Sequence, residues 1–145
     1  MKYLLDTAPW INGVTLPDAL PPRIRRLLAK PGEDKGLCSV SLLETAILRR
    51  LGRLRFDGTL TDLFAVGLAV DVRVLELTAA IAAMTNDLPS SVPGDPFDRT
   101  IVATAVVLNL TVITADSAIR DGRACAVEYY PFKSGRSGGS QRPYP

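Results

Sequence analysis

Residues 95–116, DPFDRTIVATAVVLNLTVITAD, decide the fold that the sequence predicts. Asp95 is a good helix N-cap, Pro96 suits the first helical position, and a mostly apolar segment follows, so a long helix is expected. The run Thr111–Thr114 comes next and predicts a short buried strand that ends before Asp116. A buried helix that leads directly into a buried strand is typical of α/β proteins with a parallel sheet.

The same alternation extends over the rest of the chain. Short apolar runs predict strands, and amphipathic stretches between them predict helices. The expected strands are residues 3–5, 37–40, 72–77, 111–114 and 124–130; the expected helices are residues 23–29, 41–51, 61–69, 78–85, 95–109 and a short turn after residue 116. The proline-containing segment after residue 6 is expected to be a loop. We therefore predict an α/β fold with a mostly parallel sheet.

Composition restricts the chemistry of the protein. The 145 residues suit a single domain, predicted over residues 1–133, and residues 134–145, rich in Ser, Gly, Arg and Pro, are predicted to be a disordered tail. The chain has no histidine, which excludes Ser-His-Asp and Cys-His hydrolases, histidine-dependent ribonucleases and histidine zinc sites. The two cysteines, Cys38 and Cys125, are far apart and are expected to be free thiols.

No targeting or membrane segment is expected. An aspartate at position 6 interrupts the apolar core that a signal peptide needs. The longest apolar run, residues 101–115, is too short and too polar to span a bilayer. A cytoplasmic protein without membrane contact is therefore expected.

Four carboxylates are predicted to meet at one edge of the sheet. Asp6 and Asp116 follow strands, whereas Glu44 and Asp98 lie in the first turns of helices. In a parallel sheet the carboxyl ends of the strands and the N-terminal ends of the crossover helices share one edge, which is where open α/β sheets bind ligands. All four acids are expected at that edge.

Three of these acids also have a structural interpretation. Glu44 could complete a capping box with Ser41, Asp98 could interact with the dipole of its own helix, and Asp116 could cap the short helix that follows it. Asp6 has no cap to form in the expected loop. Crowded carboxylates repel one another, however, and a helix N-terminus offsets only ~0.3–1 kcal/mol for each of them. A hard divalent cation such as Mg²⁺ or Mn²⁺ would relieve the repulsion and activate a water for attack on a phosphodiester.

These motifs together resemble the PIN-domain ribonucleases, and in particular the toxins of bacterial VapBC toxin–antitoxin pairs. The matching stretches cover about residues 1–130 and occur in the family's order: Tyr3–Thr7, Ser39–Glu44, Asp95–Arg99 with Ile101–Ala105, and Val112–Asp116. The resemblance implies an α/β/α sandwich with a mostly parallel central sheet of four to five strands.

The resemblance also implies a function. It implies the endoribonuclease toxin of a type II pair, a hydrolase that uses Mg²⁺ or Mn²⁺ and acts on RNA. Its partners would be a cognate antitoxin, whose C-terminal segment covers the acidic site, and a second copy of the chain in a homodimer. The implied catalytic and metal-binding residues are Asp6, Glu44, Asp98 and Asp116, with Thr7, Ser41, Asp95, Arg99 and Thr114 as secondary candidates. Many relatives have histidine where this chain has Ala8, but the four acids do not require it.

Several surface features have two interpretations. Two basic groups could contact the RNA backbone or could be solvated helix faces: Arg23, Arg25, Arg26 and Lys30, and Arg49, Arg50, Arg53 and Arg55. Arg99, next to Asp98, is expected to be better placed for a phosphate or an antitoxin carboxylate. Trp10, Ile11 and Val14 either pack internally or line a groove for an antitoxin helix.

Two other functions stay open. An aspartate phosphotransfer enzyme would use Asp6 as its nucleophile, but the phosphatase pattern needs a second aspartate at position 8, where alanine stands, and a receiver domain needs an acidic pair after the first strand. A catalytically inactive PIN-fold module that binds RNA or protein would keep the fold without the chemistry. The intact set of acids argues against this module.

Overall fold

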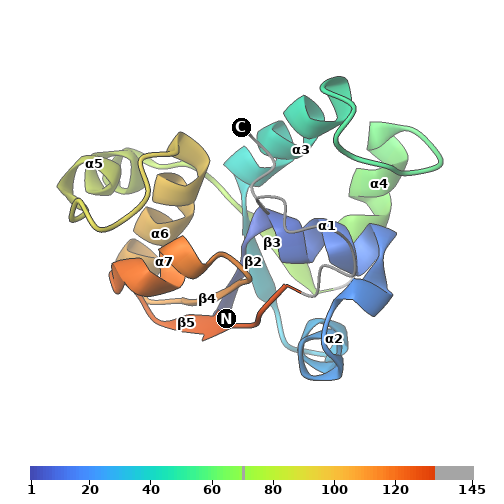
Figure 1. Cartoon of the computed structure of the whole chain (residues 1–145), viewed down its shortest axis with the longest axis horizontal. Coiled ribbons are helices and arrows are strands. Elements are labelled where there is room, and N and C mark those ends of the chain that lie inside the picture. Colours follow the sequence, from blue (N-terminus) through green and yellow to red (C-terminus); the bar gives the residue numbers. More distant parts are fainter. Residues whose placement is uncertain (70, 133–145) are drawn as a thin grey trace.

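The computed structural model describes residues 1–69 and 71–132, which form one β-sheet with helices on both faces (Figure 1). The predicted tail, residues 134–145, lies outside the described residues. The strands are β1 (Tyr3–Leu5), β2 (Lys35–Cys38), β3 (Val72–Leu75), β4 (Thr111–Thr114) and β5 (Val127–Tyr129). The helices are α1 (Thr7–Thr15), α2 (Pro22–Ala29), α3 (Ser39–Arg50), α4 (Leu60–Gly67), α5 (Ala79–Asp87), α6 (Pro96–Leu108) and α7 (Ser117–Gly122), with a 3-10 turn η1 (Pro17–Ala19).

The five strands are all parallel and follow the order β3-β2-β1-β4-β5, which confirms the predicted α/β fold. From β1 the chain builds outward through β2 to β3, and it then returns to the other side of β1 for β4 and β5. The order therefore reverses between β1 and β4, where Leu5 is paired with Ile113. Such a reversal opens a crevice at the carboxyl ends of the two strands, which is the usual ligand site of this architecture.

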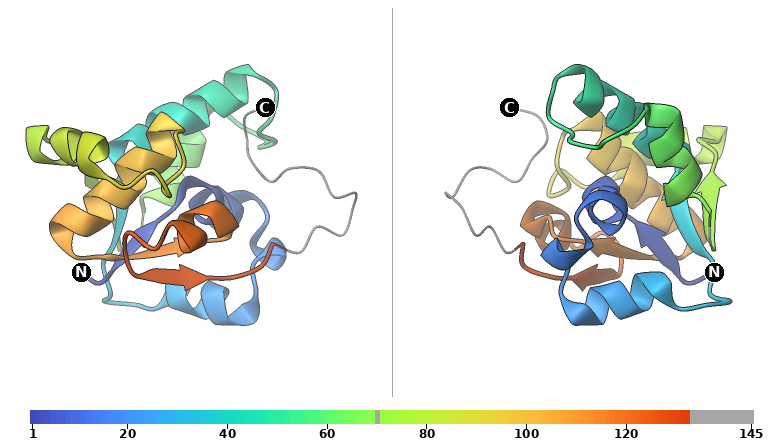
Figure 2. Two further views of the ribbon diagram at one scale, coloured as in Figure 1. Left: turned by 60° about the vertical axis from the view of Figure 1, so that its left-hand side comes forward. Right: turned by 90° about the vertical axis from the view of Figure 1, so that its right-hand side faces the viewer.

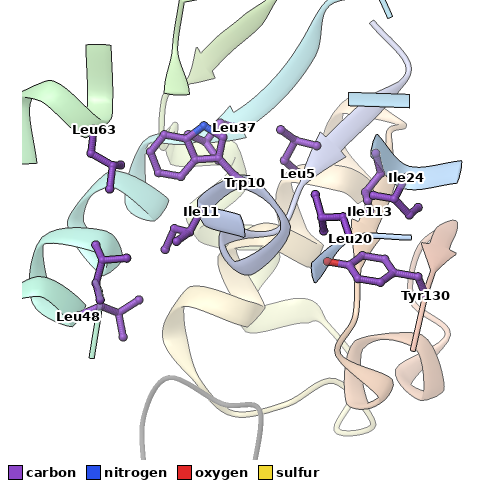
Figure 3. Packing of buried hydrophobic residues seen from close by; sticks show 11 residues of the cluster. Leu5, Trp10, Ile11, Leu20, Ile24, Leu37, Leu48, Leu63, Ile113 and Tyr130 are labelled. Carbon is purple, nitrogen blue, oxygen red and sulfur yellow. The ribbon is translucent and has the colours of Figure 1, made fainter. Parts of the chain in front are cut away.

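Helices cover both faces of the sheet, so the three-layer sandwich is confirmed (Figure 1). Successive strand residues point to opposite faces. Leu5 accordingly packs in a cluster with residues of α1, α2 and α4 (Figure 3), whereas Leu4 packs against Ile101 of α6. The apolar content of α6 is explained by this burial, because Ile101 is fully buried. None of the helices in the described ranges is long and apolar enough to cross a membrane.

The segment after β1 forms helix α1, so the prediction of a loop there was wrong. Asp6 is its N-cap and accepts a hydrogen bond from Thr7 N at 2.8 Å. Pro9 is tolerated because the N–H groups of the first helical turn have no partner within the helix. Trp10 and Ile11 are buried in the core at 3% and 7% exposure, so their interpretation as internal packing is confirmed.

Helix α3 begins two residues earlier than predicted, and the capping box of Ser41 and Glu44 is wrong. Strand β2 ends at Cys38, where its pairing with β3 ends, and Ser39 is already helical. Ser41 is the third residue of the helix, and no side chain caps this helix. The last predicted strand is also shorter, because β5 begins at Val127.

A close contact between α1 and α4 yields the first testable prediction. Trp10 Nε1 donates to the Gly67 carbonyl at 2.9 Å, and a Cβ on Gly67 would lie 2.6 Å from Trp10 Cζ2. Gly67→Ala is therefore expected to lower the free energy of unfolding by about 1–3 kcal/mol, the usual effect of overpacking. Gly94→Ala, which meets no heavy atom within 4 Å, is the control. Equal denaturation midpoints for the two variants would contradict the contact.

Candidate active site

The sequence-predicted acids lie near one another at the carboxyl edge of the sheet, because the charges of Asp6, Asp116 and Glu44 all act on Asp98. Asp6 directly follows β1, and Asp116 follows β4 and caps α7 by accepting from Ala118 N at 2.8 Å. Asp95 caps α6 by accepting from Phe97 N and Asp98 N. The capping interpretations of Asp95 and Asp116 are therefore confirmed. Capping uses one carboxylate oxygen of each, so it does not prevent a second role.

Two hydrogen bonds restrain the carboxylate of Asp6. It is 8% exposed, Thr114 Oγ1 donates to its Oδ2 at 2.6 Å, and Thr7 N donates to its Oδ1. Burial raises the pKa of Asp6 to about 6, an effect that these two hydrogen bonds reduce and that the charges of Asp116 and Asp95 increase. Thr114 also accepts from Asp116 N at 2.9 Å, so one hydroxyl connects the two strand-end acids.

One hydrogen bond joins α1 to α3 next to Asp6, and a second one lies within α3. Thr7 Oγ1 donates to Ser41 Oγ at 2.9 Å, and Thr45 Oγ1 donates to the Ser41 carbonyl. Ser41 is fully buried, and Glu44, one turn further along α3, is 4% exposed. Thr7 and Ser41 thus hold together the two helices that bear Asp6 and Glu44.

The other acids affect the pKa of Asp98, which lies in the first turn of α6. Its pKa is raised to about 8, first by burial and then by the charges of Asp6, Asp95, Asp116 and Glu44. The structure therefore brings the four predicted acids and Asp95 into electrostatic contact. Among residues 1–69 and 71–132, however, no three acidic, cysteine or histidine side chains are arranged so that they could hold a metal ion. The acids are neighbours, but their side chains do not form a completed coordination shell.

The chemistry of the donors nevertheless suits a hard divalent cation. All the polar groups that surround Asp98 electrostatically are carboxylates, and oxygen ligands are those that Mg²⁺ and Mn²⁺ prefer. The raised pKa of Asp98 shows that like charge accumulates here without a compensating cation from the protein. A bound cation would stabilise the ionised acids. The residues present therefore fit such an ion.

Arg99 does not have the position that the sequence suggested. Its guanidinium donates to the carbonyls of Thr85, Leu88 and Val92 at 2.7–3.2 Å. The side chain thereby fastens the end of α5 and the following loop to α6. The expected contact with a phosphate or an antitoxin carboxylate is not supported, because backbone carbonyls already occupy the guanidinium.

Tyr130 is a polar neighbour of the site that sequence reasoning missed. The residue is 1% exposed and lies in the core cluster beside Ile113 (Figure 3), and its hydroxyl has no hydrogen-bond partner among the described residues. Burial and the charge of Asp6 raise its pKa. An aromatic residue after a short strand is usually a core residue, so the sequence carried no signal for this position.

A comparison with protein families agrees with this fold. Residues 3–123 match the PIN domain family, which is most of the chain. The chain belongs to the PIN domain family.

Particular relatives refine this assignment. Over 56 residues, 39% of this chain, it is 45% identical to Ribonuclease VapC22 of Mycobacterium tuberculosis (strain ATCC 25618 / H37Rv), and the aligned stretch spans 43% of that protein, less than half of its length. Among solved structures, VapBC2 from Rickettsia felis bound to a promoter DNA fragment has a TM-score of 0.67 at 15% identity, covering 89% of this chain and 98% of that one. DNA-bound VapBC from Salmonella typhimurium has a TM-score of 0.66 at 20% identity with the same coverage. FitAcB from Neisseria gonorrhoeae has a TM-score of 0.59 at 26% identity, covering 86% and 95%.

Proposed function

We propose that this protein is a divalent-metal-dependent endoribonuclease and the toxin of a type II toxin–antitoxin pair. Asp6, Glu44, Asp98 and Asp116 form its catalytic and metal-binding set, within a PIN domain that spans residues 1–133. The observation that carries the proposal is the convergence of these acids at one edge of the sheet, where burial and then the charges of Asp6, Asp116 and Glu44 raise the pKa of Asp98. Groups with strongly shifted pKa values in a crevice at a switch point are candidates for function.

The relatives support the same proposal. The curated relative is named a ribonuclease, and the similar structures from Rickettsia felis and Salmonella typhimurium are VapBC complexes. We infer RNA as the substrate, an antitoxin protein as the partner, a homodimer as the functional form and the cytoplasm as the location. Mg²⁺ or Mn²⁺ is the proposed cofactor.

The side chains of this protein would prepare the site for phosphodiester hydrolysis. When bound, the divalent ion supplies Lewis-acid stabilisation of the phosphoryl charge and an acidified water. Asp6 is held in one orientation by Thr114 and Thr7, so its carboxylate needs little reorganisation on binding. Helices α1, α3, α6 and α7 all begin at this edge of the sheet, and their N-terminal dipoles partly offset the negative charge of the acids.

Cleavage of RNA by the purified protein tests the proposed function. With a pool of structured RNAs, cleavage is expected in Mg²⁺ or Mn²⁺ and is expected to stop in EDTA and to resume when excess metal is restored. The products are expected to be internal fragments, resolved on a denaturing gel. Cleavage that continues in EDTA would contradict the carboxylate–metal chemistry. Tight RNA binding without cleavage in any divalent ion would favour an inactive binding module.

A further inference from the structure

Helix α3 leads into an arginine-rich segment, the arginine loop, which consists of residues 49–58 and includes the last two residues of the helix. The segment from Arg49 to Arg55 contains four arginines and no acid. The helix closes with Arg53 N donating to the Leu48 carbonyl at 2.9 Å, and Gly52 adopts φ +72° in the left-handed region. This is the hydrogen-bond pattern of a Schellman ending, which requires a residue such as glycine.

Arg49 fixes the rest of this arginine loop. Its guanidinium donates to the Phe56 carbonyl at 2.9 Å and to the Gly58 carbonyl at 2.7 Å. Leu54 is 9% exposed, and both Leu54 and Phe56 pack in the core cluster. One arginine and two apolar anchors therefore hold the loop, which presents the remaining arginines outward.

Two of the outward arginines, Arg50 and Arg55, differ in their pairing from several other arginines of the protein. Arg50, Arg53 and Arg55 are exposed, and within the described ranges neither Arg50 nor Arg55 forms an ion pair or a side-chain hydrogen bond. Three other arginines, by contrast, each form an ion pair with a carboxylate: Arg23–Glu128, Arg25–Asp18 and Arg73–Asp34. Arg50 and Arg55 thus carry positive charge that no ion pair among the described residues neutralises.

The same helix connects this charge to the candidate active site. Glu44 lies in the middle of α3, and Arg50 is six residues further on, about 9 Å along the axis at 1.5 Å per residue. The connection from α3 to α4 lies at the end of α3 that is remote from the sheet (Figures 1 and 2). An RNA phosphate near the acids is repelled by their charge, and basic groups about one Debye length away would offset this repulsion.

We propose that the arginine loop binds the phosphate backbone of the RNA beside the bond that is cleaved, with Arg50 and Arg55 as the contacting residues. This inference rests on the proposed function, for which it names a substrate-binding surface. The planar guanidinium can hold phosphate oxygens with two hydrogen bonds. We favour RNA over an acidic protein segment because these guanidinium groups follow Glu44 on the same helix, and because Leu51 is the only large apolar side chain that residues 49–58 expose.

RNA binding measured in an Asp6→Asn background, which separates binding from cleavage, tests this inference. The probe is a fluorescently labelled oligoribonucleotide of about 20 nucleotides, and its Kd is measured by anisotropy at several salt concentrations. We assume that each arginine contacts one phosphate and that each contact adds about 0.7 to the slope of log K against log salt. Adding Arg50→Gln and Arg55→Gln is expected to raise Kd about tenfold or more and to reduce the slope of log K against log salt by about 1.4. The thermal midpoint should not change, because both side chains are exposed.

The matched control changes the same number of charges on α2. Arg25→Gln with Arg26→Gln alters two exposed-face residues of α2, which lies on the opposite side of the molecule from α3 in Figures 1 and 2. The control is expected to change Kd less than twofold. An equal loss of affinity in both double variants would overturn the inference, since net charge alone would then explain binding.

Two further outcomes separate the inference from the proposed function. Unchanged RNA affinity in the arginine-loop variant, with loss of binding to poly-glutamate, would overturn the RNA assignment in favour of an acidic protein partner. RNA that binds the Asp6→Asn parent but is never cut by the wild-type protein would count against the proposed function. A selective loss of RNA affinity in the arginine-loop variant would still support the surface in that case.

Discussion

Asp6→Asn is expected to reduce metal-dependent RNA cleavage by on the order of 10³-fold or more, the effect of removing a group that acts directly on transition-state charge. Asparagine has nearly the same shape as aspartate, and its carbonyl oxygen can still accept the hydrogen bond from Thr7 N. The substitution therefore removes the charge while the fold and the N-cap of α1 remain. Growth arrest on expression should be lost together with cleavage in vitro.

The comparison for this substitution is an aspartate away from the crevice. Asp18 is exposed on the turn η1, and Asp18→Asn should cleave RNA as the wild type does. Asp98→Asn should lose activity as Asp6→Asn does, because it removes another proposed metal ligand. Toxicity and cleavage that are fully retained in both Asp6→Asn and Asp98→Asn would refute the proposed site.

The metal-free protein is expected to lose stability as the pH rises from about 4 to about 8. The pKa of Asp98 is raised to about 8 and that of Asp6 to about 6, from an ordinary value of 3.8. Between these values the folded protein keeps protons that the unfolded chain has released. Since the folded state then binds more protons, the free energy of unfolding falls with rising pH. We expect the free energy of unfolding to fall by about 2 kcal/mol over this range. This is well below the free energy that corresponds to the sum of the two pKa shifts, because Asp98 is partly exposed to solvent and the acids affect each other.

Thermal melts in EDTA between pH 5 and pH 8 measure this effect. Asp98→Asn should flatten the pH dependence and raise the melting temperature at pH 8, whereas Asp18→Asn should leave both nearly unchanged. Excess Mg²⁺ or Mn²⁺ should reduce the loss at pH 8, because the ionised acids bind the cation in the folded state only. A wild-type melting temperature that is independent of pH in EDTA would show that the acids are not crowded.

Much of the fold could be predicted because local patterns determine it. The apolar run Thr111–Thr114 forms β4, and the Asp95-Pro96 pair starts α6 at the expected residue. Strands and helices alternate, so parallel pairing through crossover helices was the expected arrangement. Asp6, Asp98 and Asp116 could be assigned to one edge for the same reason, since their positions depend only on where strands end and helices begin. Glu44 was expected in the first turn of its helix, but it lies in the second turn because α3 begins at Ser39.

Other features depended on contacts that the local sequence does not reveal. The segment from Thr7 to Thr15 has little helical patterning and forms α1 because Trp10 and Ile11 are buried in the core. The position of Arg99 next to Asp98 suggested a free guanidinium, but this group donates hydrogen bonds to the carbonyls of Thr85, Leu88 and Val92. Ser41 looked like a cap and instead accepts from Thr7, 34 residues away.

By itself, the sequence determined which residues stand at the carboxyl edge of a parallel sheet and that their chemistry must proceed without histidine. Only the tertiary structure decided the hydrogen bonds and the pKa values of those residues. Thr114 Oγ1 donates to Asp6 across a separation of 108 residues, and the pKa of Asp98 is raised by acids from β1, α3 and the ends of β4 and α6. The physical reason is that a carboxylate's position follows from its own strand or helix, whereas its charge state depends on burial and on charges that distant segments bring close to it.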